Sequence, residues 1–320
     1  MKRRNLMKGA VLAATLGMTA GAATAQEAEK KIIGVSIPSA THGFMGGLNW
    51  HAQDTIARLG KAYPNLEFVL ATAGDAAKQV NDIEDMMATR NIDGLVVLPF
   101  ESEPLTAPVK AVKDAGKFVT VVDRGLSEEG IEDLYVAGDN TAFGRVAGEY
   151  FKANLKPGSK IVVLRGIPTT LDNERVEAFQ KALEGSDVEI LDMQHGNWNR
   201  DDAFAVMQDY LSKYPKIDAV WAADDDMAIG VLEAISAANR NDEMWVIGGA
   251  GMKEIVKRIM DGDKQLPVNV TYPPALISSA IEMTALHFVS NAPMTGRFII
   301  GSQLITPENA KQFYYPDSPF

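Results

Sequence analysis

The amino-acid sequence predicts an α/β fold with two doubly wound lobes, each built on a parallel sheet. Short runs rich in β-branched residues alternate with longer amphipathic segments from residue 32 to residue 289, and this alternation is typical of parallel sheets with right-handed crossovers. The alternation pauses near residue 138 and restarts, so each half is long enough for its own domain. The run GLVVLP at residues 94–99 lacks polar alternation, as expected of a strand covered on both faces.

The first set of elements lies before residue 138. Leu48, Ala52 and Ile56 share one face of a helix, and Val80 and Ile83 share a face of the next. Strands are expected at residues 32–37, 66–70, 94–99 and 118–122, with helices at 44–61, 75–90 and 104–115.

The second set of elements follows residue 138 and repeats the pattern. Strands are expected at residues 160–164, 188–191, 219–221, 245–247 and 268–270. Helices are expected at residues 142–153, 173–183, 201–214, 226–238, 253–260 and 274–289.

Three crossings between the lobes are expected, because the alternation pauses near residues 138–140, 270–272 and 297–302. The first lobe should then comprise residues 31–138 and 272–297, and the second lobe residues 139–271 and 298–320. Three crossings form a three-segment hinge, about which two lobes can close with little internal change.

Residues 1–25 have the organisation of a cleaved export signal. Arg3 and Arg4 lie in a basic start, and the uncharged residues 9–25 end in Ala-Thr-Ala. We expect cleavage after Ala25 and residence in the periplasm. The arginine pair also fits a twin-arginine signal, so that route and the general secretory route both stay open. The alternative to a signal is an ordinary amphipathic helix.

Composition and charge exclude several classes of function. The signal segment carries four of the 31 basic residues and none of the 42 acidic ones, so the mature chain has a net charge of −15. Such a surface repels phosphate backbones and disfavours nucleic-acid binding. The sequence has no cysteine, and its four histidines lack metal-ligand spacing. No phosphate-binding loop or nucleophile elbow is present, so we expect no cofactor, metal or catalytic residue.

Conspicuous polar residues follow the expected strands, where ligands of open α/β sheets bind. The run Asp224-Asp225-Asp226 is one of them, and it lacks the spacing of a calcium-binding loop. Because a helix begins there, Asp225 and Asp226 are expected to be capping and first-turn acids. Asp224, nearest the strand end, is expected to lie in a cleft between the lobes.

Several ordered segments resemble the ribose- and galactose-type periplasmic sugar-binding proteins, which share a fold with LacI-like repressors. The resemblance spans residues 32–304, and an export signal stands where a repressor has its DNA-binding helices. It rests on SATHGFM (39–45), VVDRG (121–125), VAGDN (136–140), NERVEAF (173–179), AADDDMAI (222–229) and VIGGAG (246–251).

The resemblance implies a set of ligand-binding residues in the interlobe cleft. They are a polar residue and the residues after it in the first turn, a clamp from the first lobe, an arginine, a stacking aromatic and a strand-end acid from the second lobe, and one residue at the last hinge crossing. By position these are Thr41 or His42, Phe44, Met45, Asp123, Arg124, Arg175, Trp198, Asp224 and Tyr272. Aromatic rings cover the faces of a sugar, while Asp and Arg bond its hydroxyls with charge assistance. The family usually has an acid where this chain has Ala250, and Asp224 is acidic where ribose binders have asparagine.

The expected function is therefore that of the periplasmic solute-binding component of an ABC importer. The ligand is expected to be a neutral monosaccharide or sugar alcohol, because Asp123 and Asp224 would balance Arg124 and Arg175. A monomer that docks on the membrane permease is expected, and a chemoreceptor is a further possible partner. The alternative is an exported carbohydrate-acting enzyme using Asp123 and Asp224. The structural alternative for Trp198 is a position in the core. The structural alternative for Asp123 and Arg124 is an ion pair on the surface.

Overall fold

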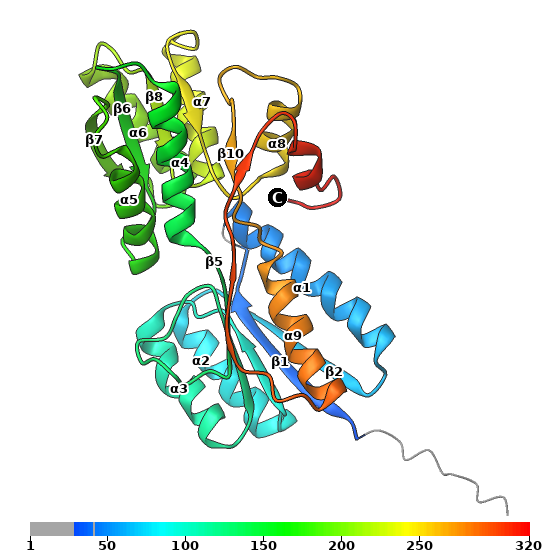
Figure 1. Ribbon diagram of the computed structural model, residues 1–320. Coiled ribbons are helices and arrows are strands. Elements are labelled where there is room, and N and C mark those ends of the chain that lie inside the picture. Colours follow the sequence, from blue (N-terminus) through cyan, green and yellow to red (C-terminus); the bar gives the residue numbers. More distant parts are fainter. Residues whose placement is uncertain (1–28, 41) are drawn as a thin grey trace, which may run out of the picture.

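The computed structural model describes residues 29–40 and 42–320, so the expected export signal lies outside the described residues. Two sheets, each with helices on both faces, lie at opposite ends of an elongated molecule (Figure 1). This confirms the predicted fold class. Within the described part of the chain, no helix is long and apolar enough to cross a membrane.

The first lobe is built on a six-stranded sheet, in the order β11-β5-β4-β3-β1-β2, in which every neighbouring pair is parallel. Helices α1 and α9 cover one face, and α2 and α3 cover the other (Figure 1). The strands are β1 (Lys31–Pro38), β2 (Leu66–Ala73), β3 (Gly94–Val97), β4 (Phe118–Val122), β5 (Leu134–Gly138) and β11 (Gly296–Ile300), and the helices are α1 (Gly43–Ala62), α2 (Ala76–Asp85), α3 (Ser102–Asp114) and α9 (Leu276–Ser290).

The second lobe is built on a four-stranded parallel sheet in the order β7-β6-β8-β9. Helices α4 and α5 pack together on one side, and α6 and α7 pack together on the other. The strands are β6 (Lys160–Arg165), β7 (Glu189–His195), β8 (Ala219–Ala222) and β9 (Trp245–Ile247), and the helices are α4 (Asn140–Asn154), α5 (Thr170–Leu183), α6 (Arg200–Lys213), α7 (Asp225–Ala237) and α8 (Lys253–Met260).

Three segments connect the lobes, and they are bonded to one another. The Asp139 amide donates to the Ile300 carbonyl at 2.9 Å, and the Thr271 amide donates to the Gln303 carbonyl at 2.9 Å. The antiparallel pair of β10 (Asn269–Val270) and β12 (Leu304–Ile305) continues this contact into the second lobe. A short 3-10 helix, η2 (Ala310–Phe313), then packs beside α8.

The structure departs from the sequence prediction at β5, which was not expected as a strand, at β11 and after α2. Strand β11 stays in the first sheet to Ile300, three residues past the expected boundary at 297, because it pairs with β5 as far as Gly138. The helix expected at residues 75–90 is regular only to Asp85. It then widens into a π-helical turn, η1 (Met86–Arg90), before Asn91 adopts a left-handed φ of 45°.

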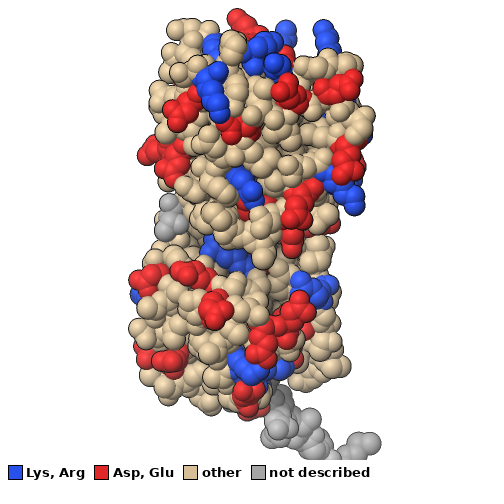
Figure 2. Space-filling model, turned by 90° about the vertical axis from the view of Figure 1, so that its left-hand side faces the viewer, with Lys and Arg blue, Asp and Glu red and all other residues tan. Residues whose placement is uncertain are grey.

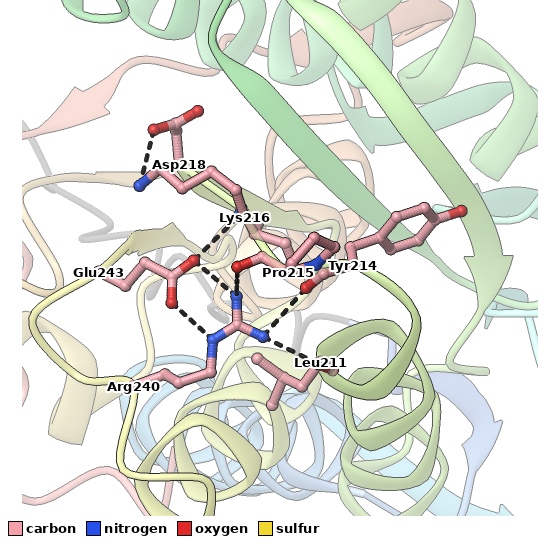
Figure 3. A network of polar contacts seen from close by, with 8 residues as sticks. Leu211, Tyr214, Pro215, Lys216, Asp218, Arg240 and Glu243 are labelled. Atoms are coloured by element: carbon pink, nitrogen blue, oxygen red, sulfur yellow. Dashed lines mark hydrogen bonds and ion pairs between the residues drawn. The ribbon is translucent and has the colours of Figure 1, made fainter.

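A network around Arg240 fixes the end of the second lobe that lies away from the hinge (Figure 3). Its guanidinium pairs with Glu243 and donates to the carbonyls of Leu211 and Tyr214 at 2.9 and 3.1 Å. Glu243 also accepts from the Ile217 amide at 3.0 Å. These contacts hold the segments that precede β8 and β9. The two strands are thus fixed at their amino ends, and their carboxyl ends lie at the opposite edge of the sheet.

Candidate functional site

A cavity of about 430 Å³ lies between the lobes, at the carboxyl ends of strands from both sheets. Nine of the ten residues expected from the sequence line it, and Thr41 lies outside the described residues. The lining consists of His42, Phe44, Met45, Asp123, Arg124, Leu171, Arg175, Trp198, Asp224, Ala250 and Tyr272.

Asp123 is the first lobe's buried carboxylate, and it follows β4 with a left-handed φ of 60°. Its Oδ1 accepts a hydrogen bond from the Tyr272 hydroxyl at 2.5 Å, and its carbonyl accepts from the Tyr135 hydroxyl at 2.6 Å. A non-glycine residue in this region is uncommon and needs such support. The two tyrosines hold the strained turn so that the carboxylate faces the cavity.

Arg124 is held by the first lobe and not by Asp123. Its Nη1 donates to the Phe100 carbonyl at 2.6 Å. In the described part of the chain, no ion pair joins Asp123 or Asp224 to either cavity arginine. The alternative of a surface Asp123–Arg124 ion pair therefore does not hold, since Asp123 is buried and is not paired with Arg124.

Arg175 is the second lobe's buried arginine, on α5. Its Nε donates to Asn140 Oδ1 at 2.9 Å, and its Nη1 donates to the Ala223 carbonyl at 3.0 Å. The guanidinium lies over the rings of Phe143 and Tyr272, 4.2 and 4.4 Å from their centroids. Among the described residues Nη2 has no hydrogen-bond acceptor. The plane of the guanidinium is thus fixed, with donor capacity remaining for a ligand.

Asp224 is the N-cap of α7, where its Oδ1 accepts from the Met227 amide at 3.0 Å. Burial raises the pKa of Asp224 well above its usual range, with the charge of Asp226 adding to the effect. The charge of Arg175 acts in the opposite direction, but burial outweighs it. A hydroxyl that donates to Asp224 would stabilise its charged form.

Asp225 and Asp226, which follow Asp224, make different contacts. Asp225 is fully buried and accepts from the Gly251 and Met252 amides at 2.9 and 2.7 Å, and from Asn269 at 2.6 Å. Burial raises the pKa of Asp225 to about 7. It holds the Ala250 turn, while Asp226 reaches across to the first lobe, where its Oδ2 accepts from the Gly43 amide at 2.9 Å.

Aromatic side chains enclose the cavity from both lobes. Phe44 stands 6.4 Å from the His42 ring in a stacked arrangement and 6.0 Å from Tyr272. Trp198 has a left-handed φ of 52°, and its indole packs so closely on Gly166 that a Cβ there would lie 2.0 Å from Nε1. Trp198 is only 8% exposed, yet it lines the cavity, so it is both packed and available to a ligand on one side.

Two buried polar atoms on the cavity lining lack partners among the described residues, His42 Nδ1 and Trp198 Nε1. Burial and the neighbouring charge of Arg124 lower the pKa of His42 to about 4, so the imidazole is neutral near neutral pH. Buried polar groups are normally hydrogen-bonded, and an unpaired one is costly. The pair therefore indicates that a polar molecule completes the site.

The cleft is open on one side of this cavity. A second, outer chamber shares His42, Asp123, Arg124 and Trp198 with it and extends to Glu101 and to Thr169, Thr170 and Glu174. Figure 2 shows basic side chains emerging at the waist between the lobes on the face that it draws. The outer chamber provides a polar route into the cavity.

Sequence reasoning missed several residues that shape the site. Leu171 lines the cavity, while Tyr135 and Asn140 orient Asp123 and Arg175. Asn140 lies inside the VAGDN segment and at an expected crossing between the lobes, so its position was a usable signal. Tyr135 lies within a strand, and its contact with Asp123 depends on register alone.

Comparisons with known proteins identify similar chains. Residues 33–289 match the family described as periplasmic binding protein domain. The D-ribose/D-allose-binding protein of Pseudomonas aeruginosa is 29% identical over 194 residues, which are 59% of this chain and 60% of that protein. The ribose import binding protein of Escherichia coli is 27% identical over 95% of this chain and 100% of its own length. The structure of the Caulobacter myo-inositol binding protein bound to myo-inositol has a TM-score of 0.78 and 26% identity, covering 88% of this chain and 95% of that one.

Proposed function

The chain belongs to the periplasmic binding protein family, and we propose that its interlobe cleft captures a neutral monosaccharide or sugar alcohol for an ABC importer. The family consists of the solute-binding components of transporters and not of enzymes. Relatives named for ribose, allose and myo-inositol support a ligand with many hydroxyl groups.

One observation carries the proposal. Two acids and two arginines line one cavity that also has aromatic walls, with Asp123 and Arg124 from the first lobe and Asp224 and Arg175 from the second. Equal numbers of acids and arginines favour a ligand without net charge, because a buried uncompensated charge costs several kcal/mol. The aromatic walls suit the apolar C–H faces of a sugar ring, and the charged groups suit its hydroxyls.

The two lobes are proposed to close on the ligand by turning about the three connecting segments. The backbone bonds of Asp139 and Thr271 keep these segments together, so they can bend as one hinge. Closure would exclude water and strengthen each charged contact in the cavity. Solution scattering with and without ligand measures the expected compaction, and an unchanged radius of gyration would count against closure.

Membership of this family places the mature protein in the periplasm as a component of an import system. We propose that it acts as a monomer, that the closed form docks on the permease, and that export uses the signal in residues 1–25. A chemoreceptor would recognise the same closed form.

A thermal-shift panel of pentoses, hexoses and polyols tests the proposed ligand class. A ligand that binds only the folded state stabilises it by RT ln(1 + [L]/Kd), which is about 2.7 kcal/mol at a hundredfold excess over Kd. At least one neutral sugar or polyol should raise the melting temperature, while amino acids and sugar phosphates should not. Stabilisation by charged compounds alone would overturn the proposal.

A further inference from the structure

Helix α1 begins in the first lobe without a cap from its own lobe. His42 occupies the N-cap position but makes no capping hydrogen bond with its side chain, and the first turn contains no acid. Five helices of the structure are capped by a residue directly before them, namely Asp75, Asp139, Thr169, Asn199 and Asp224. An uncapped N-terminus leaves amides unpaired and a partial positive charge exposed.

Asp226 supplies the missing cap from the other lobe. It lies in the first turn of α7, and its Oδ2 accepts from the Gly43 amide at 2.9 Å, although the two residues are 183 positions apart. Its carboxylate is mostly buried, and Arg200 of α6 lies 3.8 Å from Oδ1. A carboxylate that accepts from an N-terminal amide makes a charge-assisted bond, which is stronger than a neutral one.

Gly43 allows this close approach. A Cβ at position 43 would lie 2.6 Å from Asp226 Oδ2 and 3.1 Å from the Met252 methyl group. Both atoms are the ends of flexible side chains, so a larger residue at position 43 would displace the Asp226 carboxylate from the Gly43 amide.

The contact also joins the two helix starts that line the cavity. Phe44 follows Gly43 on α1, and Asp224 precedes Asp226 by two residues at the start of α7. Both Phe44 and Asp224 line the cavity. Gly43 and Asp226 bring the lobes together at the start of α1. Separation of the lobes must break this bond.

We propose that Asp226 is a latch, a positioning residue that caps α1 only when the lobes are closed and thereby slows the release of ligand. The inference rests on the proposed capture of a ligand between the lobes. Each time the lobes open, the cap is lost and α1 regains an unpaired N-terminus. The latch adds to the free energy of closure without touching the ligand, so it affects dissociation more than association.

The test compares Asp226→Ala with wild type and with Asp201→Ala, which removes an exposed first-turn acid from α6. Loss of an N-cap typically corresponds to a change of roughly 2- to 30-fold in an equilibrium constant. Asp226→Ala should accelerate dissociation of the sugar found in the thermal-shift panel by about that factor, measured by stopped flow, with a smaller change in association. Asp226→Asn retains an acceptor and should recover part of the loss, and Asp201→Ala should match wild type.

A second variant and a second measurement separate the latch from the ligand. Gly43→Ala changes the other lobe and should accelerate dissociation in the same direction. Solution scattering of the ligand-free proteins should show more open forms for both variants than for wild type. The scattering needs no ligand, so it tests the latch even if the sugar panel fails. Unchanged scattering together with unchanged dissociation in folded Asp226→Ala and Gly43→Ala would overturn the proposal.

Discussion

The Tyr272 hydroxyl donates to Oδ1 of Asp123 at 2.5 Å and joins two residues that are 149 positions apart in the sequence. Tyr272 belongs to a segment that connects the lobes, and Asp123 directly follows strand β4 of the first sheet. The same tyrosine ring lies under the Arg175 guanidinium of the second lobe. One side chain at the hinge thus orients a charged group from each lobe.

Removal of the Asp123 carboxylate should nearly abolish binding. Asp123→Ala takes away an acceptor for ligand hydroxyls and leaves the Tyr272 hydroxyl unpaired. The expected loss is about 2 to 5 kcal/mol of binding free energy, which is usual when a buried charged partner is truncated. Calorimetry measures this loss, with Asp54→Ala, which removes an exposed acid of α1, as the control. Wild-type affinity in a folded Asp123→Ala protein would place the carboxylate outside the site.

Trp198 should contribute to affinity through its ring face. Trp198→Ala should weaken binding by about 1 to 3 kcal/mol through lost area and stacking. Trp198→Phe keeps an aromatic face and should recover part of that loss. If both folded variants bind like wild type, the indole belongs to the core and does not contact the ligand.

Ala250 should set ligand preference together with Asp224. The resemblance indicates an acid at position 250, whereas this chain has an alanine with a left-handed φ of 99°. A ligand that needs a carboxylate there would leave a buried hydroxyl unpaired, at a cost of about 1 to 3 kcal/mol. Ribose should therefore be a poor ligand, and a hexose, deoxysugar or polyol that engages Asp224 should be preferred.

The paired exchange Ala250→Asp with Asp224→Asn tests this compensation. Asp is among the residues that tolerate a left-handed backbone, so the exchange is compatible with the turn. It should move the ligand ranking in the thermal-shift panel toward ribose. Tight ribose binding by the wild type, or an unchanged ranking in the double variant, would show that the compensation is wrong.

His42 should make stability depend on pH. Its pKa is lowered from 6.5 to about 4 in the folded protein, chiefly by burial. Between these values the unfolded chain binds more protons, so this contribution to stability is fully present above about pH 6.5 and is lost as the pH falls toward 4. The free energy of unfolding of wild type minus that of His42→Gln, from urea titrations, should decrease from pH 7 to pH 4.5. A constant difference would contradict the assignment.

The two-lobed fold followed from the alternation of strands and helices, because that pattern is local. What depends on long-range contacts was harder to predict. Strand β11 is short, and its hydrophobic residues Phe298 and Ile299 are exposed, so its place in the first sheet depends on pairing with β5. Likewise, Asp226 was expected to be a first-turn acid of its own helix. Only its hydrogen bond with the Gly43 amide shows that it caps α1 of the other lobe.

The candidate site was predictable where the chemistry lies at a strand end. Asp123, Arg175 and Asp224 follow expected strands or begin helices, and the lobes bring them to one cavity. The absence of Asp–Arg pairs among them was not predictable, since carbonyls of Phe100 and Ala223 take the arginine donors instead. Every residue has a backbone carbonyl, so the residue type does not indicate which carbonyl accepts a hydrogen bond.

A calorimetric titration of wild type, Asp123→Ala and Arg175→Ala with the most stabilising sugar tests the central claim most directly. If a neutral sugar is held between the lobes, it binds one molecule per chain, and loss of either charged group, one from each lobe, weakens binding at least about tenfold, or 1.4 kcal/mol. Binding that depends on one of the two residues alone, or on neither, would contradict capture between the lobes.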